Sequence, residues 1–216
     1  LLSSAFLTIA LATAAFSQPT KRQSGRVITS CTVVFMQNIV DSLDAKGVKS
    51  TFFINGCIYG DTEIAALQNA YSKGHQIGSH TWAHKDLATL TTNEVESEFT
   101  LTDMALEKIP GIKVAFMRPP YGSYNDGDFD SGDSVGESAA NSEKDYDTLV
   151  AKHPSTILTL NHETIRDTTV LPHALDVLLG ANYSLVTVAE CMGQPPYLSV
   201  ATPSAQDASW TCSGTD

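Results

Sequence analysis

Two histidines four residues apart are the side chains in this sequence that most directly suggest chemistry. His80 and His84 follow a short apolar run, and on a helical turn residues at that spacing share one face, with Cβ atoms about 5–6 Å apart. Two neutral imidazoles so placed can converge on one Zn²⁺, each nitrogen about 2.0–2.1 Å from the metal. A metalloprotease helix would carry Glu directly after its first histidine, whereas Thr81 follows His80. Thr81 at this position therefore excludes that protease class. The spacing of the two histidines alone is also compatible with two surface residues.

Strands and helices alternate along the chain, and each polar motif directly follows an expected strand. Apolar periodicity and turn residues place strands over 48–55, 76–78, 113–117, 156–160 and 184–188. They place helices over 34–46, 61–73, 91–108, 144–153 and 171–179, the third beginning in a capping box at 91–94. Residues 123–142 have no period and predict a loop. This order predicts an α/β fold of parallel strands, whose carboxyl ends carry the polar motifs.

The length and net charge of the chain limit how many domains it can contain and which partners it can bind. A chain of 216 residues predicts one domain, and its net charge of −11, from 13 basic and 24 acidic residues, argues against a nucleic-acid partner. Residues 1–17 are predicted to be a truncated secretory leader, too short for a comfortable membrane span. Residues 18–25 are expected to be a linker or propeptide, 26–192 the domain, and 193–216 a Pro- and Ser-rich tail on the surface.

The four cysteines favour disulfides over thiol chemistry if the chain is secreted. They are Cys31, Cys57, Cys191 and Cys212, an even set for which three pairings are possible. None of them stands in a CxxC spacing, which argues against a thiolate zinc site.

Four motifs together resemble the polysaccharide deacetylase family, which carries the NodB homology domain, and most closely its fungal chitin deacetylases. They are His80-Thr81-Trp82-Ala83-His84, Arg118-Pro119-Pro120-Tyr121, Asp130-Ser131-Gly132-Asp133 and Leu160-Asn161-His162-Glu163. Any one of them is a weak signal, but four in the family's order form a strong one. The resemblance implies a distorted (β/α) barrel and metal-dependent removal of acetyl groups from N-acetylglucosamine units. It implies a secreted or cell-wall location, a chitin or N-acetylglucosamine oligosaccharide substrate and a monomeric protein.

The resemblance also assigns roles to residues. His80 and His84 would hold a divalent metal, most simply Zn, and His162 would protonate the leaving amine. Arg118 would be catalytic, and Asp133, with Asp130, would orient His162.

Other residues would then bind substrate or join the ends of the domain. With Pro120 beside it, the backbone N–H of Tyr121 would stabilise the oxyanion, and Leu160 would line the acetyl pocket. The family places Cys31 and Cys191 at the two ends of the domain, so they are expected to form a disulfide, which leaves Cys57 with Cys212.

One departure from the family is serious. Its first motif, Thr-Phe-Asp-Asp-Gly-Pro, supplies the catalytic base and third metal ligand, yet no Asp-Asp pair occurs in this sequence. Val33 meets Val34 where a strand and its acidic turn should intervene, and a second gap follows residues 124–126. Because both losses are clean and flanked by intact family sequence, they resemble omitted exons more than gradual decay. The barrel is therefore expected to be incomplete.

Three functions are compatible with these residues. The first is a secreted chitin or polysaccharide deacetylase of which this chain is an incomplete version. The second is a non-catalytic carbohydrate-binding protein that kept the groove and lost the base. The third is another metal-dependent amidase, acting on peptidoglycan or a small molecule.

Overall fold

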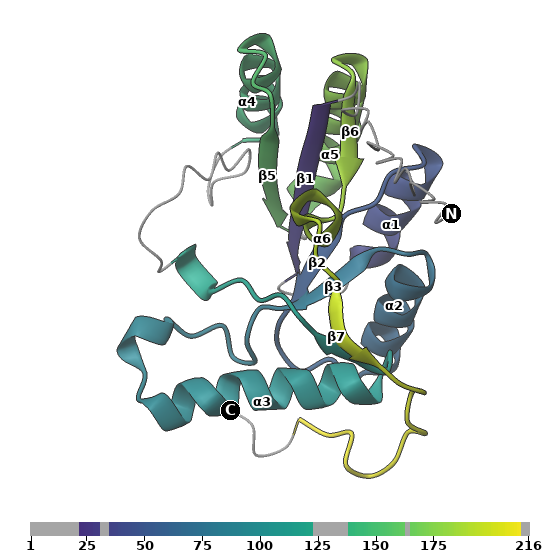
Figure 1. Ribbon diagram of the computed structural model, residues 1–216, viewed down its shortest axis with the longest axis vertical. Coiled ribbons are helices and arrows are strands. Elements are labelled where there is room, and N and C mark those ends of the chain that lie inside the picture. Colours follow the sequence, from purple (N-terminus) through teal and green to yellow (C-terminus); the bar gives the residue numbers. More distant parts are fainter. Residues whose placement is uncertain (1–21, 31–34, 123–137, 163–164, 213–216) are drawn as a thin grey trace, which may run out of the picture.

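The structure is a computed structural model that describes residues 22–30, 35–122, 138–162 and 165–212 (Figure 1). The predicted leader, Cys31, Asp130 and Asp133 lie outside these residues, so what was expected of them stays a prediction.

Within the described residues, five parallel strands form the main sheet. They are β1 (Arg22–Ser30), β2 (Thr51–Ile54), β3 (Gln76–Ser79), β5 (Ile157–His162) and β6 (Tyr183–Val186). β1 is central: one of its edges pairs with β5, while the other pairs with β6 over Arg22–Gly25 and with β2 over Val27–Ser30. β3 lies beyond β2. The predicted parallel α/β arrangement is confirmed.

The position of β1 differs from one prediction. β1 begins at Arg22, inside the stretch 18–25 that was expected to be a linker or propeptide, and it ends at Ser30, before the Val33–Val34 junction where a strand and its acidic turn were predicted to be missing. The first half of its sequence is polar, so no apolar pattern marked it. Pairing with three other strands determines its structure instead. The Asp-Asp motif remains absent from the sequence.

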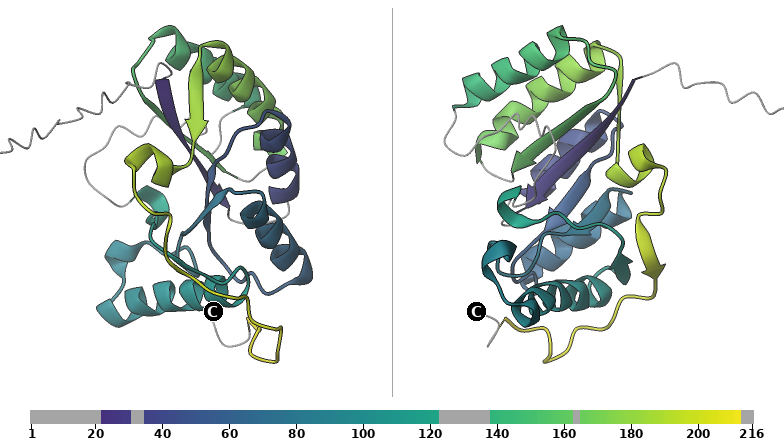
Figure 2. Two further views of the ribbon diagram at one scale, coloured as in Figure 1. Left: turned by 45° about the vertical axis from the view of Figure 1, so that its right-hand side comes forward. Right: turned by 60° about the vertical axis from the view of Figure 1, so that its left-hand side comes forward.

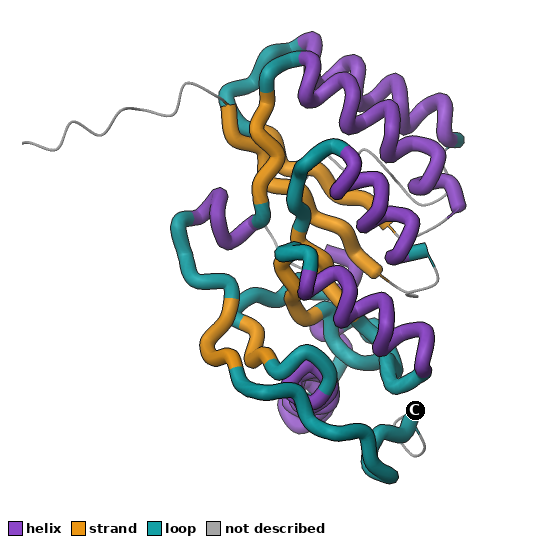
Figure 3. The backbone as a smooth tube through the Cα atoms, turned by 90° about the vertical axis from the view of Figure 1, so that its right-hand side faces the viewer, coloured by secondary structure: helices purple, strands orange, loops and turns teal. Residues whose placement is uncertain are grey.

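Four helices lie against one face of the sheet. They are α1 (Met36–Ala45), α2 (Asp61–Ser72), α4 (Ala139–Ala151) and α5 (Ile165–Gly180) (Figures 2 and 3). α1 and α2 match the predicted helices closely, and α1 buries the apolar face that its periodicity indicated. α4 and α5 begin earlier than predicted. For α4 the reason is Ser138, whose side chain caps the helix by accepting from the N–H of Asn141 at 3.2 Å.

The longest helix, α3 (Thr92–Lys108), crosses one end of the sheet and begins as the sequence predicts (Figure 1). The N–H of Glu94 donates to Thr91 Oγ1 at 3.4 Å, and the N–H of Thr91 donates to Glu94 Oε2 at 2.8 Å. This reciprocal pair is the capping box expected at 91–94.

The other face of the sheet carries a helix, α6 (Val188–Met192), and an antiparallel pair formed by β4 (Ile112–Val114) and β7 (Tyr197–Val200) (Figures 1 and 2). The sequence did not reveal α6 and β7, whereas β4 overlaps the predicted strand 113–117 but pairs antiparallel with β7. Part of the predicted surface tail is therefore a strand. Two short 3₁₀ turns, Leu87–Thr89 and Pro120–Gly122, complete the described elements. Among the described helices, none has the length and apolar character of a membrane span.

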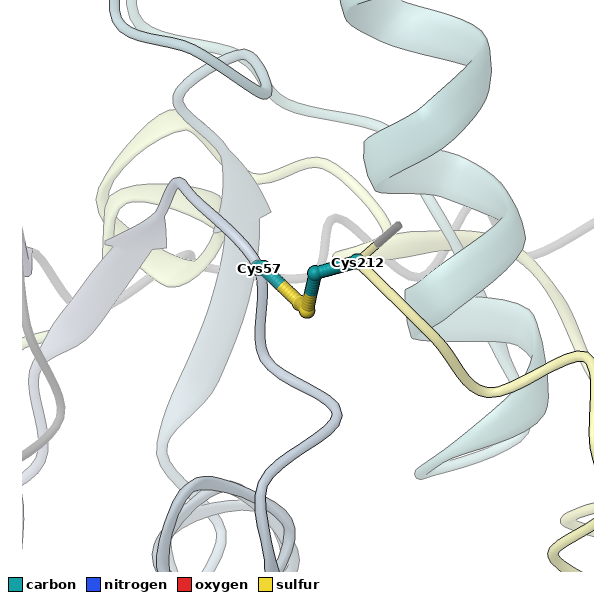
Figure 4. The surroundings of a disulfide bond; sticks show 2 residues. All are labelled: Cys57 and Cys212. Atoms are coloured by element: carbon teal, nitrogen blue, oxygen red, sulfur yellow. A yellow bond between two sulfur atoms is a disulfide. The ribbon is translucent and has the colours of Figure 1, made fainter. Parts of the chain in front are cut away.

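The end of the tail is fastened to the domain by a disulfide between Cys57 and Cys212 (Figure 4). Lys108 of α3 also donates to the hydroxyl of Ser209 at 2.9 Å. Cys191 is exposed and has no disulfide partner among the described residues. Because Cys31 lies outside them, the Cys31–Cys191 pair stays a prediction, whereas the Cys57–Cys212 pair is present.

Alternating side chains of β2 divide the core between the two faces of the sheet. Phe52 and Ile54 pack with the helices, whereas Phe53 joins Leu160, Phe116 and Val188 on the opposite face. The second cluster is small and lines an apolar groove of about 370 Å³. Arg118, one of the predicted site residues, lines the same groove.

Candidate active site

His80 is placed by the carboxyl end of β3, as the sequence predicts. Its N–H donates to the carbonyl of Ile54 at 2.8 Å, which continues the β2–β3 register by one residue. On the other side of β3, the N–H of Ser79 donates to Phe116 O at 3.0 Å, and the N–H of Arg118 donates to Ser79 O at 2.9 Å. This short parallel bridge, at the end of the predicted strand 113–117, brings Arg118 next to His80.

The two histidines converge through their Nε2 atoms, which are 3.1 Å apart. Two nitrogens on one tetrahedral metal would be about 3.3 Å apart, as follows from bond lengths of about 2.0–2.1 Å. His80 Nδ1 is 2.6 Å from the carbonyl oxygen of Arg118, so Nδ1 carries the proton and Nε2 presents its lone pair. This arrangement fits a pair of metal ligands with the first one already oriented.

The backbone around the pair differs from the helical turn that the spacing suggested. Residues 80–85 form an irregular turn in which Thr81 and His84 adopt left-handed φ angles of 69° and 53°. For residues other than glycine such angles cost about 1–3 kcal/mol each and persist only where surrounding contacts impose them. The side chains therefore converge because the turn is constrained, not because they share a helix face.

Two contacts hold the centre of this turn. The N–H of Gly56 donates to the carbonyl of Trp82 at 2.7 Å, and the Trp82 ring is buried against Tyr59. The N–H of Ala83 donates to Glu98 Oε2 at 2.6 Å. The sequence analysis missed Glu98, although a signal existed. It precedes Thr102 and Ala105 by four and seven residues and therefore lies on the buried face of α3.

Arg118 and Tyr121 complete the side of the site that faces solvent. Arg118 Nη1 lies 3.4 Å from His80 Nε2, and the Tyr121 ring packs edge-on against His84 with centroids 4.8 Å apart. Tyr121 is 70% exposed and has a φ of 58°, while Pro120 before it is buried. A fixed backbone thus presents an exposed ring beside the histidines, an arrangement suited to stacking on a ligand.

Burial keeps both histidines neutral. It lowers the pKa of His80 to about 3, an effect that the charges of Arg118, His84 and His162 increase and the bond to the Arg118 carbonyl opposes. Burial also lowers the pKa of His84, with Arg118 and His162 adding to the effect and the Glu98 carboxylate opposing it. Metal ligation needs deprotonated imidazoles, so near pH 7 the pair is in the required state.

His162 ends β5, half-buried, in register with Thr29 near the end of β1. Its charge adds to the lowering of the pKa values of His80 and His84. Leu160, two residues earlier, lines the apolar groove together with Phe116, and Arg118 stands at its edge. The structure thus brings His80, His84, Arg118 and Tyr121 into contact with one another, while Arg118 and Leu160 both line the groove.

Within the described residues, the candidate metal site has two ligands, His80 and His84. The described portion of the chain contains no group of three or more His, Cys, Asp or Glu side chains that could hold a metal ion. The cationic guanidinium of Arg118 lies instead beside His80, with Nη1 3.4 Å from His80 Nε2. The described residues therefore fit two positions of a divalent metal site and do not complete it.

Comparison with known proteins bears on these residues directly. A family model described as "Polysaccharide deacetylase" matches residues 30–136, a region that contains His80, His84 and Arg118. The chain contains a polysaccharide deacetylase domain. A chitin deacetylase of Pestalotiopsis sp. is 41% identical to it, with 53% of this chain and 45% of the relative covered. Chitin deacetylase 1 of Cryptococcus neoformans var. grubii is 28% identical, with 74% and 42% covered.

Solved structures agree on the fold of the deacetylase domain. The chitin deacetylase of Colletotrichum lindemuthianum superimposes with a TM-score of 0.73 at 23% identity, covering 82% of this chain and 89% of that one. The predicted NodB-type architecture is confirmed. The chain spans less than half the length of the first curated relatives it matches. The match to the Pestalotiopsis protein runs over 137 aligned residues yet covers 53% of this 216-residue chain, so the relative has residues in that region that this chain lacks.

Proposed function

We propose that this chain is an incomplete version of a secreted, metal-dependent deacetylase that removes N-acetyl groups from chitin or related N-acetylglucosamine polymers. The observation that carries the proposal is the convergence of His80 and His84, with Arg118 and Tyr121 in contact with them and Arg118 also lining an apolar groove. A neutral oligosaccharide is also a partner that the net charge of −11 does not repel.

Each residue of the site has its own role in the proposed reaction. His80 and His84 would hold a divalent metal, most simply Zn, which when bound supplies polarisation of the acetamide oxygen and a water of lowered pKa. His162, at the end of β5, donates a proton to the leaving amine. Leu160 and its apolar neighbours receive the acetyl methyl group, because that groove excludes water from one side of the reacting carbon.

The Tyr121 backbone N–H stabilises the developing oxyanion in this proposal. The left-handed φ of Tyr121 gives that N–H a fixed direction, independent of the exposed ring. Asp133 would orient His162, and it lies outside the described residues.

We infer that the chain as written does not deacetylate chitin oligomers at a useful rate. A positioned general base contributes about 10²–10⁴-fold, and the sequence lacks the acidic motif that supplies it. His162 cannot replace the base, because it must carry a proton at the start of the reaction. The Arg118 guanidinium near His80 Nε2 also disfavours a cation between the histidines when no carboxylate balances it.

The test compares the chain with a version in which an Asp-Asp-containing segment is restored between Val33 and Val34. Deacetylation of chito-oligosaccharides is expected from the restored version alone, and circular dichroism shows whether both are folded. His80→Ala in the restored version should abolish zinc binding and activity. Full activity from the folded, unextended chain would mean that another carboxylate serves as base. Assays on peptidoglycan in parallel address the alternative of a different amidase.

A second function is favoured by one observation. Tyr121 is exposed beside His84, while the sequence lacks the acidic motif that supplies the catalytic base; a carbohydrate-binding protein without activity would retain such a ring. Contiguous genomic codons for Val33 and Val34, together with binding of chitin oligomers without turnover, would support it. An intervening in-frame segment encoding Asp-Asp would support the deacetylase.

A further inference from the structure

Glu98 is a buried carboxylate that the proposed chemistry does not use. It lies on α3, is 5% exposed, and its Oε2 accepts from the backbone N–H of Ala83 at 2.6 Å. Its other oxygen, Oε1, is 3.7 Å from the exposed Nζ of Lys85. A carboxylate is rarely buried without strong partners, and a short bond to a backbone N–H is a charge-assisted one.

The bond falls at the position where the histidine turn needs support. Ala83 lies directly before His84, and the left-handed residues Thr81 and His84 flank the central dipeptide. The Gly56 N–H holds Trp82 from one side through its carbonyl, and Glu98 holds Ala83 from the other side through its N–H. Consecutive residues between the two histidines are thus fixed to two different parts of the fold, the segment that follows β2 and the helix α3.

We propose that Glu98 is a positioning residue, which sets the distance between the His84 and His80 imidazoles through its hydrogen bond to Ala83 and thereby controls metal affinity. This inference rests on the proposed metal site. Glu98 acts through the backbone and does not contact the metal. Its reach and its acceptor atom are therefore the properties that matter, whereas its negative charge is secondary.

Two conservative variants separate the reach of the Glu98 side chain from its negative charge. Glu98→Gln keeps the side-chain length and an acceptor oxygen but removes the charge, while Glu98→Asp keeps the charge and shortens the side chain by one methylene. Glu96→Gln is the matched control, because Glu96 is exposed on the same helix. Leu106→Ala, on the buried face of α3, controls for loss of stability alone.

The first readout is zinc affinity, measured by competition with a chromophoric chelator. Glu98→Asp should weaken it by about tenfold or more, the usual effect of removing a residue that orients metal ligands. Glu98→Gln, Glu96→Gln and Leu106→Ala should stay close to the wild type. Unchanged affinity in Glu98→Asp would overturn the proposal, and so would equal losses in the Gln and Asp variants, because charge would then be the active property.

The second readout keeps the inference separate from the proposed function. In the metal-free protein, the ¹⁵N and ¹H imidazole signals of His80 and His84 report their mutual contact. They should move in Glu98→Asp and be retained in Glu98→Gln. If the wild type binds no zinc, the metal site fails while these signals still decide the role of Glu98. If Glu98→Asp does not fold, retention of the signals in Glu98→Gln supports the proposal and their loss overturns it.

Discussion

Gly78→Ala tests how β3 delivers His80 to the site. Gly78 lies two residues before His80, and a Cβ added there would be 2.6 Å from Phe53 Cε1 and 3.0 Å from the carbonyl oxygen of Phe116. Contacts that short force a neighbour to move. The Phe53 ring lines the apolar groove and can shift only by disturbing the small inner cluster, whereas the Phe116 oxygen belongs to the backbone and accepts the Ser79 N–H that holds the bridge beside β3.

Overpacking of this kind costs about 1–3 kcal/mol, so we expect Gly78→Ala to lower the free energy of unfolding by that amount. Gly180→Ala is the matched control, because a Cβ there meets none of the described residues within 4 Å and Gly180 ends α5. Alanine is the better helix former, so the control should stabilise the protein by up to about 1 kcal/mol. The two substitutions are chemically identical and are expected to have opposite signs.

Urea unfolding followed by circular dichroism measures both effects. The double variant Gly78→Ala/Phe53→Leu removes the ring that clashes, so its loss of stability should be smaller than the sum of the two single losses. Zinc affinity should also fall in Gly78→Ala, because the end of β3 carries His80. A Gly78→Ala protein with wild-type stability, or strictly additive losses, would refute the packing of Phe53 against β3.

Three further predictions concern stability. Burial lowers the pKa of His75 from 6.5 to about 4, so its contribution is complete above pH 6.5 and is lost as the pH falls toward 4. His75→Gln should therefore flatten this part of the curve of unfolding free energy against pH by up to about 3 kcal/mol, and a parallel curve would contradict the assignment. Reduction of Cys57–Cys212, which spans a sequence separation of 155, should cost up to about 5 kcal/mol in urea unfolding. A Cys57→Ser/Cys212→Ser protein should then be insensitive to reductant. Thr91→Ala should cost about 0.5–2 kcal/mol in the same assay, since it removes the cap of α3, and no loss would show the cap to be dispensable.

Local signals predicted the elements whose sequence alone determines their structure. The apolar spacing of α1 and the capping box of α3 are properties of a few neighbouring residues, so both helices were found with nearly their final bounds. β1 and β7 could not be found this way. Each becomes a strand through partners far away in the chain, and three of the four residues of β7 are exposed.

In the candidate site, too, local motifs were predicted and features that depend on distant contacts were not. His80, His84 and Arg118 were predicted from their motifs, and the structure brings them together. The backbone between the histidines was not predicted, because left-handed φ angles at Thr81 and His84 depend on contacts with α3 and with the segment that follows β2. Glu98 was missed for that reason: its role depends on a hydrogen bond across fifteen residues.

The pairing of β1 also has a consequence for biosynthesis. When residues up to 79 have been synthesised, β1 can pair with β2 over Val27–Ser30, but its partners β5 and β6 begin only at Ile157 and Tyr183. Closing such long loops before their contacts form makes parallel sheets slow to fold. The nascent chain therefore carries an unpaired strand edge through most of translation, a period in which aggregation competes with folding. Expression should benefit from slow translation or chaperones more than from changes to the surface of the finished protein.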